Sequence, residues 1–68
     1  MRTKQINYAM QLGREAQVEN KMRIPWQDKI LIDSMKTHQE SVEGNATFTE
    51  LFEAWLKGWD LQNAGNYN

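Results

Sequence analysis

Residues 47–62 constrain the fold of this chain more than any other segment, because their large side chains recur at helical spacing. The segment reads TFTELFEAWLKGWDLQ, and its apolar positions are three and four residues apart: Phe48, Leu51, Phe52, Trp55 and Trp59. This spacing predicts one amphipathic helix with an aromatic face. Thr47 followed by Glu50 predicts a capping box, and Asn63 and Gly65 predict the end. We therefore expect a helix over 47–63.

The length of the chain limits the size of its core. With 68 residues it is one domain, 1–68, near the lower limit at which a single hydrophobic core outweighs chain entropy. Cysteine is absent, so no disulfide supports the fold. No apolar run approaches the roughly 20 residues that cross a bilayer, and the N-terminus lacks the apolar core of a secretory signal. We expect a cytoplasmic protein with no membrane contact.

The N-terminal region predicts a first helix over 3–22 with a narrow stripe of small residues. Ala9, Gly13 and Ala16 share one face at helical spacing. A glycine inside a helix costs about 1 kcal/mol relative to alanine, so Gly13 indicates close approach of another helix. We expect Gly13 to face the region of Gly58. The expected core consists of Ala9, Gly13, Ala16, Phe52, Trp55 and Gly58.

Pro25 predicts a boundary between the first helix and a second one. Proline has no N–H and disfavours the α conformation of the residue before it, so the first helix should end near 22–25. A short second helix is expected over 26–39, with Pro25 in its first turn; a strand at 29–32 is the alternative. Residues 41–47 should form a turn, and 65–68 a frayed tail. The predicted fold is all-α, with three helices.

The sequence contains no arrangement of residues typical of catalysis or metal binding. His38 is the only histidine, and no strained nucleophile turn accompanies it. One imidazole with carboxylates such as Asp33 makes a weak transition-metal site. Glu50 and Glu53 fall opposite the aromatic face, where carboxylates are normally solvated. We expect no enzyme activity, no metal and no cofactor.

Charge is distributed unevenly along the chain. Residues 1–36 carry a net charge of +3 and residues 37–68 a net charge of −4. Two helix faces that attract each other explain this pattern, and a polar binding surface is the alternative. Nucleic acid is a weaker candidate partner, because the sequence pI of 5.7 is low for phosphate binding.

The surplus of tryptophan favours a binding surface. Trp55 and Trp59 are one turn apart and are expected in the core, with one of them partly exposed. Tryptophan and arginine are enriched at interface hot spots, which directs attention to Trp59, Trp26 and Arg23. The candidate partner-binding residues are Arg14, Lys21, Arg23, Trp26, Lys29 and Trp59.

Three short motifs resemble those of the ribosome modulation factor family and its phage-borne relatives. They are Ala9-x-x-x-Gly13-x-x-Ala16, Pro25-Trp26, and Trp55-Leu-Lys-Gly58-Trp59-Asp, which together cover about half the chain. The resemblance implies two helices joined by a proline-aromatic linker, with Gly13 and Gly58 as close-packing points and Pro25, Trp26, Trp55 and Trp59 in a shared core. The best-known branch binds the small ribosomal subunit and promotes inactive ribosome dimers. This chain has a longer segment between Pro25 and Trp55, and it is slightly acidic where that branch is strongly basic.

These observations favour a non-enzymatic binding protein. The expected partner is a host protein or ribonucleoprotein complex, bound stoichiometrically, as phage and mobile-element regulators or inhibitors bind theirs. The alternative is a ribosome-associated, rRNA-binding hibernation factor in which Arg14, Lys21, Arg23 and Lys29 contact phosphates. A homodimer is compatible with both functions, since a small core gains from burying its apolar surface against a second copy.

Overall fold

The computed structural model describes residues 2–65 and contains three α-helices. They are α1 (Arg2–Val18), α2 (Lys29–Lys36) and α3 (Phe48–Asn63), with a 3₁₀ turn, η1 (Pro25–Gln27), before α2. No strand occurs within residues 2–65, so the all-α prediction is confirmed and the strand considered at 29–32 is wrong.

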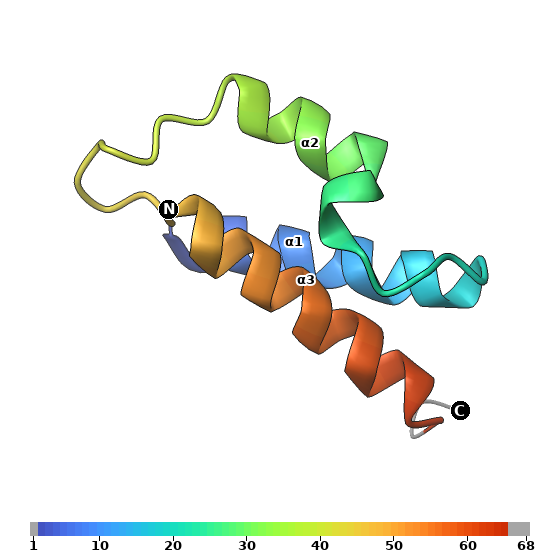
Figure 1. Cartoon of the computed structure of the whole chain (residues 1–68). Helices are drawn as coiled ribbons and strands as arrows, with labels where there is room; N and C mark the ends of the chain where they lie inside the picture. The colour runs from blue at the N-terminus through green and yellow to red at the C-terminus, as the bar shows by residue number, and fades with distance from the viewer. Residues whose placement is uncertain (1, 66–68) are drawn as a thin grey trace.

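Helices α1 and α3 lie side by side and run in the same direction (Figure 1). Near their starts Arg2 pairs with Glu50, and near their ends Gln17 Nε2 donates to Asn63 Oδ1 at 3.2 Å. Two ion pairs join residues 1–36 to residues 37–65: Arg2 with Glu50, and Arg23 with Asp60. The expected attraction between the basic and acidic parts of the chain is thus present.

Two glycines allow the backbones of α1 and α3 to touch. A Cβ atom on Gly13 would overlap the carbonyl group of Trp55, whose carbon would lie only 2.8 Å away. A Cβ on Gly58 would overlap the carbonyl group of Met10 in the same way. The predicted close crossing at Gly13 and the Gly58 region is confirmed.

The core lies between this helix pair and α2. Of the predicted core residues, Ala9, Gly13, Ala16, Trp55 and Gly58 are buried, whereas Phe52 is only half-buried against the core. The expected core did not include several other apolar residues that are buried: Leu12, Leu31, Ala46, Leu51 and Ala54.

Helix α1 ends at Val18, four residues before the predicted end at 22. Asn20 adopts a left-handed conformation with φ of 62°, its N–H bonds Gln17 O at 3.0 Å, and Lys21 N–H bonds Ala16 O at 2.9 Å. These two bonds form a Schellman motif with asparagine in the position that glycine usually takes. The helix is therefore terminated by Asn20, and the prediction that Pro25 terminates it was wrong.

The second helix is shorter than the predicted 26–39, and Pro25 is not part of it. Pro25 begins η1, and Asp28 then caps α2 by accepting hydrogen bonds from the backbone N–H groups of Ile30 and Leu31. The chain leaves α2 at Thr37. The helix was predicted to start too early because proline is favoured in the first turn of 3₁₀ and α helices alike.

The start of α3 agrees with the sequence prediction. The Thr47 side chain accepts from Glu50 N–H, and the Glu50 carboxylate accepts from Thr47 N–H, which forms the capping box. The helix ends at Asn63, as predicted, and Gly65 follows in a turn with φ of 73°. The rest of the predicted tail, 66–68, lies outside the described residues.

Candidate partner-binding surface

Exposed apolar side chains are concentrated in the segment that connects α1 to α2. Four large hydrophobic residues in this segment and at the adjoining ends of the two helices are more than half exposed: Val18, Met22, Trp26 and Ile30. Exposed lysine and arginine side chains alternate with them at Lys21, Arg23 and Lys29. We call these seven residues the connector surface.

Trp26 is the most prominent member of the connector surface. Trp26 is 65% exposed, although Asp28, two residues later, is buried. Pro25 directly before it is buried, and Asp28 N–H bonds Pro25 O at 3.1 Å. The backbone at Trp26 is therefore held by the fold while the indole faces solvent. The burial that family resemblance implies for Trp26 does not occur.

The connector is tied to the end of α3 through two other candidate residues. Trp59 Nε1–H donates to Lys21 O at 3.0 Å, and the Arg23 guanidinium donates to both carboxylate oxygens of Asp60 at 2.7 Å each. These hydrogen bonds to Arg23 lower the pKa of Asp60 and raise that of Arg23. Trp59 is half-buried against the core, whereas Trp55 is almost fully buried. The polar groups of Trp59 and Arg23 are thus engaged in contacts within the protein, and Trp59 offers a partner only its exposed part.

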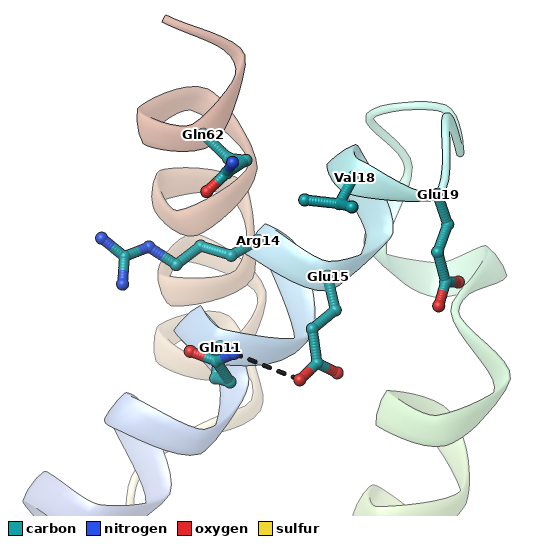
Figure 2. Close-up of a pocket in the computed structure, with 6 residues that line it drawn as sticks. All are labelled: Gln11, Arg14, Glu15, Val18, Glu19 and Gln62. Atoms are coloured by element: carbon teal, nitrogen blue, oxygen red, sulfur yellow. Dashed lines mark hydrogen bonds between the residues drawn. The ribbon is translucent and has the colours of Figure 1, made fainter. Parts of the chain in front are cut away.

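Arg14 lies in a different place from the rest of the candidate set. It lines a cleft of 310 Å³ with Gln62 of α3 and neighbouring residues of α1. In Figure 2 Arg14 extends toward α3, away from Glu15 and Glu19, and Gln11 donates to Glu15 at 3.1 Å. Of the connector surface, only Val18 lines this cleft, and the other candidate residues do not: Lys21, Arg23, Trp26, Lys29 and Trp59.

Asp28 is the most informative residue that sequence analysis missed. Only 7% of it is exposed, and its carboxylate accepts from Ile30 N, Leu31 N and Trp55 Nε1. An aspartate just before an apolar helical stretch is a typical N-cap signal, so the sequence does contain an indication of a helix start at 29. The contact with Trp55 has no signal in the sequence, because it joins residues on two different helices.

The described residues show no other arrangement with evident chemistry. No group of three or more His, Cys, Asp or Glu residues within 2–65 could hold a metal ion. His38 lies next to the loop before α3, with Nε2 2.6 Å from Ala46 O and its ring 5.9 Å from the ring of Phe48. No helix among residues 2–65 is long and apolar enough to cross a membrane.

Comparisons of the chain with protein-family models, with curated proteins and with solved structures found no match. The resemblance to the ribosome modulation factor family therefore stays a prediction from its three short motifs.

Proposed function

We propose that this protein is a non-enzymatic binding protein that acts stoichiometrically on a larger partner through the connector surface. The observation that carries the proposal is the 65% exposure of Trp26 on a backbone segment that the fold holds in place. Tryptophan is among the residues most enriched at interface hot spots, because a buried indole contributes a large apolar area.

The fixed backbone around Trp26 favours binding energetically. A side chain that is already presented by a rigid segment loses less conformational entropy on association than one on a mobile loop. Met22 and Ile30, both more than half exposed, extend the apolar area on either side of Trp26 along the chain. Lys21 and Lys29 supply a polar rim, which is the usual composition of a protein interface.

The proposed partner is a host protein or a ribonucleoprotein complex, of the kind that phage and mobile-element regulators or inhibitors bind. Binding to rRNA is the second candidate, and the exposed side chain of Lys29 favours it, whereas the Lys21 ammonium group pairs with Glu19 at 3.2 Å. The Arg23 guanidinium is already bound to Asp60, which reduces the positive charge available for phosphates. We therefore favour a protein contact centred on Trp26 over an RNA contact.

Affinity purification of the tagged protein from a bacterial lysate tests this proposal. Wild type is compared with Trp26→Ala and with Val42→Ala, which removes an exposed apolar side chain from the loop before α3. We expect wild type and Val42→Ala to recover one stoichiometric protein partner in a complex that withstands high salt. Trp26→Ala should not recover this partner. Recovery of ribosomal RNA that salt releases would favour the second candidate. Recovery of no stoichiometric partner would contradict both functions.

A further inference from the structure

A hollow opens between α1 and α2, one helical turn from the connector surface. Its volume is 130 Å³, and buried atoms of Ala9, Leu31 and Leu51 form its base. Tyr8, which is half exposed, and Ser34 lie at its sides. We propose that this hollow binds one benzene-sized apolar group.

The volume of the hollow limits what it can accept. Sites for drug-sized ligands measure about 300–1,000 Å³, so a hollow of 130 Å³ is too small for such a molecule. An apolar cavity of about 150 Å³ in another protein binds benzene. A phenyl ring or a branched aliphatic side chain therefore matches the space available.

The side chains of Gln5, Ser34 and His38 have hydrogen-bond partners within the protein, and the remaining polar residue around the hollow, Tyr8, is half exposed to solvent. Gln5 Oε1 accepts from Ala46 N at 2.7 Å, and Gln5 Nε2 donates to Asn45 Oδ1 at 2.9 Å. His38 Nε2–H donates to Ala46 O at 2.6 Å, and the Ser34 hydroxyl donates to Leu31 O at 2.7 Å. An apolar group can enter without leaving these donors unsatisfied, which is the main cost of apolar binding near polar groups.

The position of the hollow identifies its occupant, if the proposed function holds. Ile30 of the connector surface and Ser34 of the hollow are four residues apart on α2, so they lie on the same face, about 5–6 Å apart between Cβ atoms. A partner that covers Trp26 and Ile30 therefore reaches the hollow with its next side chain. We infer that the occupant is a phenylalanine or leucine side chain of that partner. This step rests on the proposed function.

Toluene tests the site without the partner. Its binding is followed by methyl NMR of the intact protein, and saturable shifts are expected at Ala9, Leu31 and Leu51. Ser34→Leu places an apolar side chain at the hollow and should weaken toluene binding by at least about tenfold. Asp33→Leu adds the same side chain to the exposed position beside it, outside the hollow, and should leave toluene binding unchanged. Shifts that do not saturate, or that are equal in both variants, would overturn the site.

The same two variants separate the site from the proposed function. If the captured partner uses the hollow, Ser34→Leu reduces its capture at least about tenfold and Asp33→Leu does not. Equal capture by both variants would overturn the assignment of the partner side chain while leaving the connector surface in place. Saturable toluene binding with no captured partner would contradict the proposed function alone, and the hollow would stand as a small-molecule site.

Discussion

The indole N–H of Trp55 donates a hydrogen bond to the Asp28 carboxylate at 2.8 Å, in the interior of the protein. The same carboxylate caps α2 through two backbone N–H groups, so one side chain connects α3 with the start of α2. Trp55 is 1% exposed, and its N–H would have no access to water if Asp28 were removed. The position of η1, and with it the position of Trp26, depends on this contact.

Replacing Asp28 with alanine should strongly destabilise the protein. The change removes an N-cap, worth about 1 kcal/mol, and leaves the buried Trp55 N–H unsatisfied, which costs about 1–3 kcal/mol. We expect the free energy of unfolding in urea to fall by about 2–4 kcal/mol. This loss would unfold much of a domain of this size, so circular dichroism should show reduced helix content.

Asp28→Asn provides the matched control, since asparagine is as good an N-cap as aspartate. Its amide oxygen can cap α2, but its NH₂ group cannot accept from Trp55. We expect a loss smaller than that of Asp28→Ala. Equal stability of wild type and Asp28→Ala would show that the Trp55 contact contributes nothing.

Gly13→Ala should be destabilising, which is the reverse of the usual effect inside a helix. At an ordinary helical position this change gains about 1 kcal/mol. Here the added Cβ would overlap the Trp55 carbonyl, and backbone atoms cannot move aside as a side-chain end can. We expect a loss of at least about 2 kcal/mol in the free energy of unfolding. Gly58→Ala should behave alike, because its Cβ would overlap the Met10 carbonyl.

Gln11→Ala is the control for the glycine variants, because Gln11 is exposed on the same helix. It should change the free energy of unfolding by less than about 0.5 kcal/mol. A Gly13→Ala variant with an unchanged or increased melting temperature would mean that α1 and α3 do not touch at this point.

The sequence predicted those parts of the fold that local patterns specify. The capping box at Thr47 and Glu50 involves residues three apart, and the close crossing follows from glycines within helical stretches. Both predictions are confirmed. The predicted end of the first helix was wrong, because Asn20 ends α1 in a conformation that asparagine adopts less often than glycine. The predicted start of the second helix was wrong, because Asp28, and not Pro25, precedes its first residue.

The candidate surface was harder to predict, because it depends on contacts between distant residues. Arg23 and Trp59 were expected to face a partner, but Asp60 and the Lys21 carbonyl engage them. Trp26, also among the candidates, is exposed, and its role in binding stays a prediction. Its exposure follows from the burial of the neighbouring Pro25, and residue type alone does not distinguish which of the two turns inward.

Trp26 should supply the tryptophan fluorescence that aqueous quenchers reach. Trp55 is buried and Trp59 half-buried, whereas Trp26 is 65% exposed. We expect acrylamide and iodide to quench part of the wild-type emission efficiently, and Trp26→Phe to remove most of that part and shift the remaining emission to shorter wavelength. Trp59→Phe should preserve the quenchable component. Equal quenching of wild type and Trp26→Phe would contradict an exposed Trp26 and weaken the proposed function.

The Arg23–Asp60 pair should make stability depend on pH in the acidic range. Its hydrogen bonds lower the pKa of Asp60 in the folded protein below the ordinary value of about 3.9. As pH falls, the unfolded chain therefore binds the proton before the folded protein does. The contribution of the pair to the free energy of unfolding is complete above pH 4 and is lost as pH falls through the lower pKa of the folded protein. Both side chains are about half exposed, so the effect is small and weakens with salt.

Urea unfolding at pH 6 and pH 3 should show a smaller stability difference between the two pH values for Asp60→Asn than for wild type. Arg23→Gln should reduce that difference similarly. The same pH dependence in all three proteins would mean that the pair does not form in solution, in which case Arg23 would be available to a partner of the connector surface.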